Sequence, residues 1–347
     1  MSIDIALWLV QDGITNGAIY ALLALALLLV FAVTRVIFVP QGEFISYAAL
    51  SLALLQSGRL PGTVYVLVIG GLAAAVFDSI GAIRDKAWTR LPRILGLYVL
   101  LPCIMVAIAW WAAREKPGLW LQMLVVLGLV VPLGPILYRL AYRPVAGASV
   151  LVLFIVSMAA HYVLSGLGLV FFGAEGLRSE PLSDAKFQLG VVTVSAQTLW
   201  VLLASLVVMA ALWLLFEYTM RGKALRATAV NRVGARLVGI PIELSGSHSF
   251  TLAAFIGALS GILISPITTI YYDTGFLIGL KGFVGAILGG MGSYPLAALG
   301  AVALGMFESF ASFWASTYKE VIVFTIIIPV LVWRSLTSRH HVEDEEE

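Results

Sequence analysis

The chain has 347 residues, of which 61% are hydrophobic and 12% charged, with a formal net charge of +2 at pH 7. Soluble domains have about 45–50% apolar and about 25% charged residues, so this composition excludes a soluble globular protein and indicates a polytopic membrane protein. The small net charge gives no reason to expect a nucleic acid partner, and the single cysteine, Cys103, excludes an intramolecular disulfide or a thiolate metal cluster.

The N-terminal segment carries Asp4 and Asp12 but no Lys or Arg before the first long apolar run. It therefore lacks the basic n-region of a cleavable signal peptide. We expect the first membrane span itself to direct insertion.

A spanning helix needs about 20 apolar residues, and the apolar runs predict a single all-α domain over 1–347 with about 9–10 transmembrane helices. Between the sixth and seventh spans, residues 173–196 are polar, and residues 191–194 are typical of a short extended piece. The predicted continuous spans cover residues 13–33, 41–56, 63–80, 94–112, 119–140, 149–172, 197–216, 247–270 and 320–332.

A glycine-rich region follows the eighth span, over residues 279–305. Glycine at this density, together with Pro295, cannot continue a regular helix. A bilayer tolerates broken backbone only where protein or water satisfies its polar groups. We therefore predict a re-entrant or broken helix pair near 280–307, with its two helices over 280–288 and 296–307.

A basic segment without any acidic residue runs from Arg221 to Pro241. Its Ala- and Leu-rich spacing predicts a short helix, which Gly239 and Pro241 would end. By the positive-inside rule the segment belongs to a cytoplasmic loop over 217–245. This loop either only fixes topology or is a docking surface for a cytoplasmic partner, which small residues would allow to approach the backbone closely. The small residues are Ala224, Ala227, Ala229, Gly234 and Ala235.

Alternation of the spans from this cytoplasmic loop places the N-terminus and residues 173–196 on the periplasmic side. Arg334 and Arg339, at the start of and within the polar C-terminal tail over 335–347, indicate a cytoplasmic C-terminus. The two signals agree if the broken pair returns to the outer face near Phe310. This agreement favours the re-entrant interpretation.

Charged residues inside the predicted spans are functional clues, because each costs about 2.5–3.5 kcal/mol at mid-bilayer on insertion scales. Glu43 is either a first-turn acid that meets the helix amides after Pro40, or a group that lines a pathway. Asp273 and Lys281 are either interfacial anchors or part of the route by which substrate arrives. Helix packing is the simplest explanation for His161. The sequence shows no convincing set of paired titratable residues at mid-span.

Four motif stretches occur in order along most of the chain. They are Gly13-x-x-x-Gly17-Ala18-Ile19-Tyr20-Ala21-Leu22 with Arg35 and Gly42-Glu43-Phe44; Tyr142-Arg143-Pro144; Arg221-Gly222-Lys223-Ala224-Leu225-Arg226-Ala227 with Ala235-Arg236-Leu237-Val238-Gly239-Ile240; and Gly279-Leu280-Lys281-Gly282-Phe283 with Gly289-Gly290-Met291-Gly292-Ser293 and Glu308. In these stretches the chain resembles the membrane-spanning permease subunit of ABC importers of the branched-chain amino acid (hydrophobic amino acid uptake) family. The resemblance implies that the basic loop is a coupling helix that seats in a groove of the ATP-binding subunit.

Two sets of candidate site residues follow, and the sequence shows no catalytic or metal-ligating set. The ATPase-coupling set is Arg221, Lys223, Ala224, Arg226, Ala227, Asn231, Arg232, Ala235, Leu237 and Gly239. The translocation-pathway set is Gln41, Glu43, Lys281, Gly289, Gly290 and Ser293.

The resemblance also implies a transport subunit rather than an enzyme, located as a multi-pass protein in the bacterial inner (plasma) membrane. No G-x-x-x-x-G-K-[ST] phosphate loop occurs, since Gly222-Lys223 lacks the upstream glycine and the following Ser or Thr. ATP is then bound by a partner subunit, and this chain needs no cofactor. The implied partners are a second permease subunit in a heterodimer, two cytoplasmic ATP-binding subunits, a periplasmic substrate-binding protein and the lipid bilayer.

Three features depart from the family pattern. Phe38-Val39-Pro40-Gln41 stands where the family shows Asn-Phe-Ala-His, Val233 replaces an acid, and residues 81–118 resemble a two-helix insertion. The substrate therefore stays open among branched-chain amino acids, other amino acids, urea, short amides and small carboxylates. The alternative function is a self-contained secondary transporter or channel, which would need paired titratable residues at mid-span.

Overall fold

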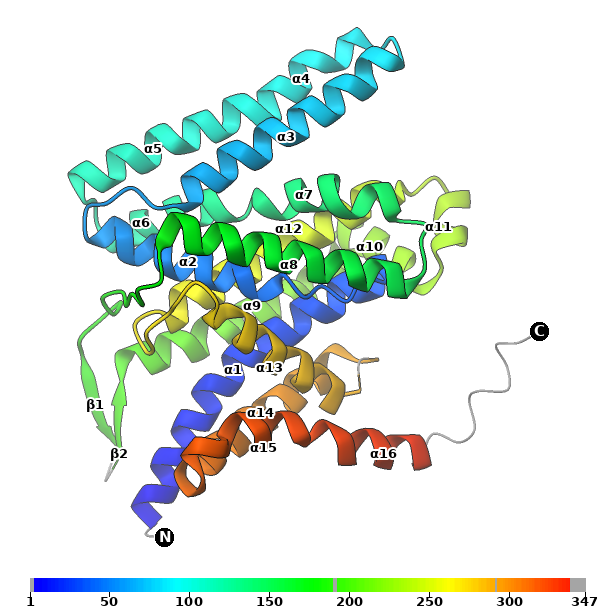
Figure 1. Cartoon of the computed structure of the whole chain (residues 1–347). Coiled ribbons are helices and arrows are strands. Elements are labelled where there is room, and N and C mark those ends of the chain that lie inside the picture. The colour runs from blue at the N-terminus through cyan, green and yellow to red at the C-terminus, as the bar shows by residue number, and fades with distance from the viewer. Residues whose placement is uncertain (1–2, 190–191, 291, 338–347) are drawn as a thin grey trace.

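The computed structural model describes residues 3–189, 192–290 and 292–337. Within these ranges it is a helical bundle with one two-stranded hairpin at the end where the N-terminus lies (Figure 1). The longer helices are α1 (Ile3–Thr34), α2 (Gln41–Gln56), α3 (Thr63–Arg84), α5 (Leu101–Glu115), α6 (Leu119–Val130), α8 (Val150–Phe172), α9 (Ala196–Tyr218), α10 (Met220–Val230), α12 (Ile242–Ile264), α13 (Thr274–Leu288), α14 (Tyr294–Trp314) and α16 (Ile327–Thr337). The short elements are α4 (Leu91–Leu95), α7 (Leu133–Leu137), α11 (Arg232–Leu237), α15 (Lys319–Thr325), β1 (Lys186–Leu189) and β2 (Val192–Ser195).

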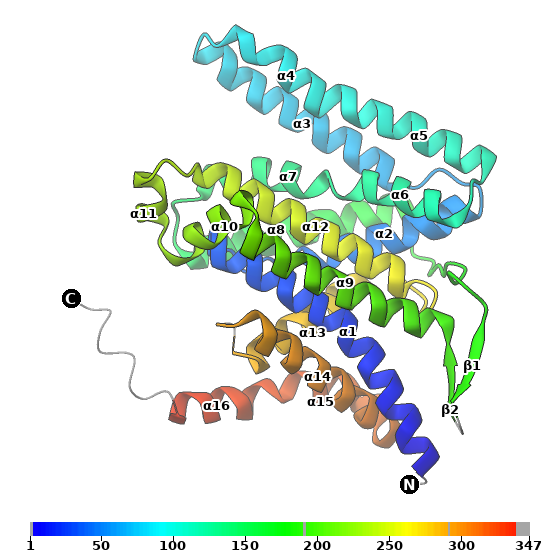
Figure 2. The ribbon, with the colours of Figure 1, turned by 180° about the vertical axis from the view of Figure 1, so that it is seen from behind.

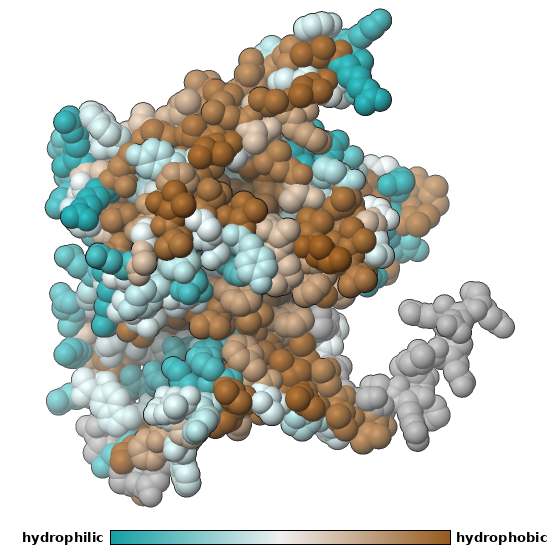
Figure 3. All heavy atoms as spheres, viewed as in Figure 1, coloured by the Kyte–Doolittle hydropathy of each residue, from teal (hydrophilic) through white to brown (hydrophobic). Residues whose placement is uncertain are grey.

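Nine helical segments in the described part of the chain are long and apolar enough to cross a membrane. They include two composite spans, Leu91–Glu115 and Leu119–Val145, in which short π-helical turns join α4 to α5 and extend α7. The all-α, polytopic prediction is confirmed. The hydrophobic surface between hydrophilic ends of the molecule, shown in Figure 3, fits a protein that crosses a bilayer.

Helix α1 is the centre of the bundle. Its residues from Gly17 to Val30 are all buried, which is the pattern of a helix that is apolar all round and enclosed by other helices. Helices α9, α12, α13 and α14 pack around it. The outer helices α3, α5, α8 and α9 instead expose many large apolar side chains, as expected for surfaces that meet lipid or a membrane partner.

Close helix contacts depend on glycine. Gly42 on α2 faces the backbone of Gly275 on α13, and a Cβ added to either glycine would overlap the other helix. Gly257 and Gly261 bring α12 against α2 in the same way. Small residues let helix backbones approach, which drives association in a membrane through packing rather than through water exclusion.

We expect Gly42→Ala to lower the thermal denaturation midpoint, because α2 and α13 must separate to accept the methyl group. Overpacking of this kind costs about 1–3 kcal/mol. The matched control is Gly166→Ala on α8, where no atom lies within 4 Å of an added Cβ. Equal midpoints for the two variants would contradict the proposed role of Gly42.

Several predicted boundaries need correction. Helix α1 begins at Ile3 rather than at residue 13, since the mostly apolar residues 3–10 continue the helix through the polar pair Gln11 and Asp12. Helix α12 covers Ile242–Ile264 rather than 247–270, because Pro241 precedes its first turn and Pro266 follows its end. The predicted two-helix insertion over 81–118 contains one candidate span, Leu91–Glu115. Two spans of about 20 residues each, with their connecting loops, do not fit within this range.

The polar loop before α9 forms a β-hairpin rather than a single extended piece. Strand β1 pairs antiparallel with β2, with Lys186 opposite Ser195. The predicted extended residues 192–194 belong to β2, while Val191 lies outside the described residues. The sequence pattern predicted the second strand, whose first three residues are β-branched, but not its more polar partner.

The predicted helix break is confirmed between Leu288 and Tyr294, where α13 ends and α14 begins. Gly290 has φ +94°, a conformation that favours glycine. Both helices are longer than predicted, and α14 has the length of a full span. Helix α16 then ends at the same end of the bundle as α10 and α11 (Figures 1 and 2). The rest of the tail, including Arg339, lies outside the described residues.

Candidate coupling surface and buried charge clusters

The basic loop folds into two short helices rather than one. Thr219 caps α10 by accepting a hydrogen bond of 3.0 Å from the Gly222 amide. Asn231 ends α10 and caps α11, where its Oδ1 accepts from the Gly234 amide at 2.8 Å. An Asn at this position favours a new helix start over continuation, which explains the break inside the predicted helix.

Four apolar side chains project from this polar loop. Their exposed fractions are 80% for Val230, 72% for Val233, 82% for Leu237 and 76% for Val238, and we call these four residues the coupling patch. A group of large apolar side chains that lies outside the membrane-spanning helices and is not covered by the chain itself marks an interaction site. Sequence reasoning selected only Leu237. The sequence feature that could have identified the other three is the recurrence of large apolar residues within an otherwise basic segment.

The structure divides the predicted coupling set by exposure. Ala235 is only 4% exposed and faces the protein's own interior, so the prediction that this small residue admits a partner is wrong. Asn231 acts as a helix cap. The residues with exposed side chains or backbone are Arg221, Lys223, Arg226, Asn231, Leu237 and Gly239, and those partly exposed are Ala224, Ala227 and Arg232.

The turn of the broken helix pair lies beside the coupling loop. Tyr294, the first residue of α14, stacks on Phe216 in the last turns of α9, with ring centroids 5.4 Å apart. Tyr294 and Arg226 of α10 also line one cavity of about 440 Å³. The break is therefore level with the end of α9. Gly289, Gly290 and Ser293, predicted as pathway residues at membrane depth, lie instead at the coupling end of the bundle.

This position predicts the labelling of Ser293. In a Cys103→Ser background, we expect Ser293→Cys to react with a membrane-impermeant thiol reagent from the same side of the membrane as Val233→Cys. Trp8→Cys is the control. Trp8 lies near the start of α1, at the end of the bundle away from the coupling loop (Figure 2), so a cysteine there should react from the opposite side of the membrane. Reaction of Ser293→Cys from the side of Trp8→Cys would contradict the placement of the turn.

A buried acid–histidine pair joins α2 to α8. A hydrogen bond of 2.7 Å connects Glu43 Oε1 and His161 Nδ1, and the Glu43 side chain is completely buried. The imidazole stacks on Phe276 of α13, with centroids 4.2 Å apart. Glu43 thus pairs with His161 and not with the amides of its own helix, which corrects one of the two predicted explanations. Gln41, also buried, donates to the Ala253 carbonyl and lines an apolar cavity of about 180 Å³ beside α13.

A second buried cluster lies between α1, α13, α14 and α15. Lys281 Nζ donates to Glu308 at 2.6 Å and to Glu320 at 3.0 Å, and Tyr20 donates its hydroxyl to Glu308 at 2.7 Å. Lys281 is 5% exposed, so it is not the interfacial anchor that its position in the sequence allowed. The sequence showed no convincing set of paired titratable residues because each partner of Lys281 lies on another helix, and only the tertiary structure brings them together.

The fold and these sites define a polytopic integral membrane protein with a helical loop exposed outside the apolar belt. The chain belongs to the family described as branched-chain amino acid transport system, permease component, whose sequence profile matches residues 9–331. The predicted family is therefore confirmed.

Curated relatives carry the same description. The chain is 29% identical over 203 residues to the high-affinity branched-chain amino acid transport system permease protein LivH of Escherichia coli, covering 56% of this chain and 65% of LivH. It is 27% identical over 302 residues to BraD of Pseudomonas aeruginosa, a protein of the same description, covering 83% of this chain and 96% of BraD. A probable branched-chain amino acid transport permease protein LivH of Methanocaldococcus jannaschii is 30% identical over 243 residues, covering 62% of this chain and 72% of that relative. No solved structure matches the chain significantly.

Proposed function

We propose that this protein is the membrane-spanning permease subunit of an ATP-binding-cassette importer, and that it forms half of the translocation pathway. The observation that carries the proposal is the coupling patch, an uncovered apolar surface on a basic loop at one end of the bundle. In this arrangement two cytoplasmic ATP-binding subunits drive transport, one of them through this loop. The chain itself catalyses no reaction and holds no cofactor.

The substrate in this proposal is a branched-chain amino acid or a related small polar metabolite. Family membership and the descriptions of LivH and BraD support that class. A periplasmic binding protein delivers the substrate, and a second, different permease subunit completes the pathway. The large apolar side chains exposed on α3, α5, α8 and α9 leave ample helix surface for both lipid and this partner.

The proposed setting is the bacterial inner membrane, with the N-terminus periplasmic and the C-terminus cytoplasmic. Two features support this orientation. The basic residues of α10 and α11 favour the cytoplasmic side. The β-hairpin and the start of α1 lie at the other end of the bundle (Figure 2).

A secondary transporter complete in one chain is the rival function. The buried Lys281 cluster and the Glu43–His161 pair supply the paired titratable residues that such a transporter needs. Both sets, however, are bonded between helices at short distances, which also suits a purely structural role. A self-contained transporter needs no cytoplasmic partner, so the uncovered coupling patch favours the importer.

The test is co-purification followed by reconstitution. The tagged chain is expressed with candidate ATP-binding and permease subunits from the same organism, purified in detergent and placed in proteoliposomes with the binding protein. We expect a complex with an ATPase and a second permease, and uptake that requires ATP. A chain that transports alone, driven by an ion gradient, would overturn the proposal. Ligand binding to the cognate periplasmic protein identifies the substrate.

A further inference from the structure

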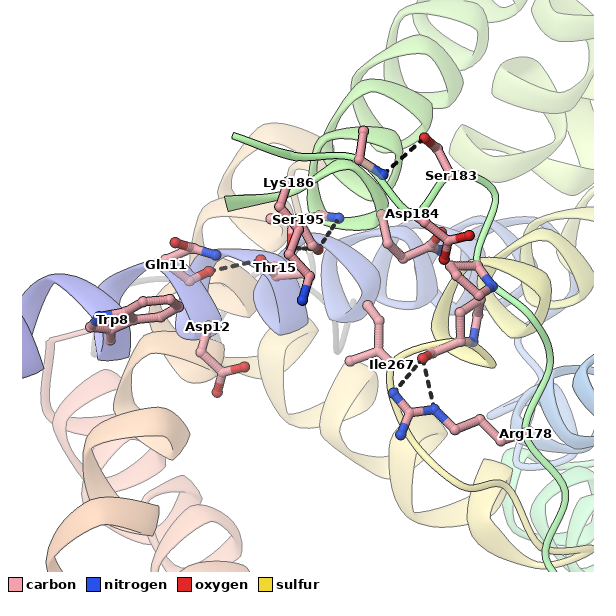
Figure 4. Close-up of a pocket in the computed structure, with 15 residues that line it drawn as sticks. Trp8, Gln11, Asp12, Thr15, Arg178, Ser183, Asp184, Lys186, Ser195 and Ile267 are labelled. Atoms are coloured by element: carbon pink, nitrogen blue, oxygen red, sulfur yellow. Dashed lines mark hydrogen bonds between the residues drawn. The ribbon is translucent and has the colours of Figure 1, made fainter. Parts of the chain in front are cut away.

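A polar pocket of about 400 Å³ opens at the end of the bundle opposite the coupling patch. Its wall consists of residues near the start of α1, the loop before β1, the ends of the hairpin strands away from their turn, the first turn of α9 and the residues after α12. Figure 4 shows Asp12, Lys186 and Ile267 around one opening, with Trp8 towards one end and Arg178 towards the other. The volume lies in the range of about 300–1,000 Å³ that is usual for small-molecule sites.

Charges of both signs line this pocket and are not paired with each other. Asp12 and Asp184 are negative, and Arg178 and Lys186 are positive, yet none of these four side chains forms an ion pair within 4.0 Å in the described part of the chain. Opposite charges that share a cavity without meeting can each serve a different charged group of one ligand.

Two of these charges are held in place by the fold. Arg178 donates to the Pro266 carbonyl from Nε at 2.8 Å and from Nη2 at 2.6 Å, so its guanidinium is fixed, while Nη1 forms no hydrogen bond within the described part of the chain. The Asp12 carboxylate accepts from Ser309 at 3.3 Å through one oxygen, Oδ2. Paired backbone hydrogen bonds of 2.9 Å between Leu177 and Ile270 hold the two loops together. The pocket is therefore preorganised, which lowers the cost of binding.

The remaining wall is mixed, with an apolar part formed by Trp8, Pro181, Pro266 and Ile267 and an uncharged polar part formed by Gln11, Thr15, Ser183, Ser195, Gln197 and Thr198. The indole of Trp8 and the side chains of Pro266 and Ile267 lie beside the charged groups. A ligand that fits must carry an anion and a cation close together and an apolar group beside them. A free apolar α-amino acid in its zwitterionic form has all three.

We propose that this pocket binds a free, zwitterionic apolar α-amino acid on the periplasmic side of the permease. Its carboxylate binds Arg178 and Lys186, its ammonium group binds Asp12, and its side chain packs on Trp8 and Ile267. In transport, this pocket would be the first site that the substrate occupies after its release from the binding protein, and this role rests on the proposed function. The binding of an amino acid to the pocket does not depend on the proposed function.

The test uses the purified permease complex in nanodiscs, without the binding protein, and L-leucine as the probe. Saturation-transfer NMR detects ligands that bind as weakly as about 1 mM. We expect saturation transfer to the leucine methyl groups, and dissociation constants raised about tenfold or more in Asp12→Asn and in Lys186→Gln, because each loses a charge-assisted contact. Glu180→Gln, on the same loop but outside the pocket, should bind leucine as the unaltered protein does.

Two analogues test the need for both charges. 3-Methylbutylamine lacks the carboxylate and 4-methylpentanoate lacks the ammonium group, and each should bind about tenfold more weakly than leucine or worse. No leucine binding, equal binding of either analogue, or unchanged binding in both pocket variants would overturn the proposal. ATP-driven uptake without leucine binding would overturn the proposed amino acid site alone. Leucine binding without ATP-driven uptake would support the amino acid site and contradict the proposed function.

Discussion

Replacing Val233 and Leu237 together with aspartate is expected to abolish ATP-driven uptake while the membrane domain stays folded. Both side chains are more than 70% exposed, so neither supports the fold of this chain. If they are central contacts with an ATP-binding subunit, each loss costs about 2 kcal/mol or more. Together the two substitutions lower the affinity for that subunit by about a thousandfold. The measurements are co-purification of the ATPase, uptake in proteoliposomes and the thermal denaturation midpoint of the permease.

The conservative pair Val233→Leu with Leu237→Met is the matched control, since it keeps the apolar surface and should retain assembly. The buried residue Ala235 gives a second comparison. Ala235→Trp should lower the denaturation midpoint, because it is only 4% exposed, and so it tests folding rather than docking. Normal uptake by the double aspartate variant would show that the loop serves only as a topology signal.

Lys281→Met is expected to cause the largest loss of stability of any single change considered. The substitution leaves the Glu308 carboxylate buried and without its cation, and removal of one partner from a buried pair costs about 3–5 kcal/mol. We expect a lower yield of folded protein and a lower denaturation midpoint. Lys319→Met is the control, because Lys319 is half exposed and 3.9 Å from Glu320, and exposed pairs contribute about 0–1 kcal/mol.

A second variant separates a structural role from a transport role. The double change Lys281→Met with Glu308→Gln removes both charges, and it should recover part of the lost stability in a double-mutant cycle. If the cluster is structural, uptake recovers together with stability. A stable double variant without ion- or ATP-driven uptake would instead assign the cluster to transport. Full stability of Lys281→Met alone would contradict the buried ion pair.

The sequence by itself determined the membrane class, most of the spans and the helix break. The reason is that lipid imposes a strong local requirement, since about 20 consecutive apolar residues are needed to cross it. Breaks are equally local, because Pro40 precedes α2 and the glycines from Gly289 to Gly292 stop α13 whatever surrounds them. The basic composition of α10 and α11 is also a local feature, and it identified the loop as a docking candidate without knowledge of the fold.

Only the tertiary structure decided which side chains meet and which remain uncovered. Glu43 pairs with His161, 118 positions away, and a buried charge gives no local sign of its partner. Within the coupling loop, Ala235 is buried and Val233 exposed, although hydrophobicity alone would suggest the reverse. Helical spacing gives relative directions around one helix, but the break at Asn231 and the packing of α11 on α12 set which direction faces inward. Residue identity therefore fixed where the chain crosses the bilayer, while helix packing fixed which residues are available for function.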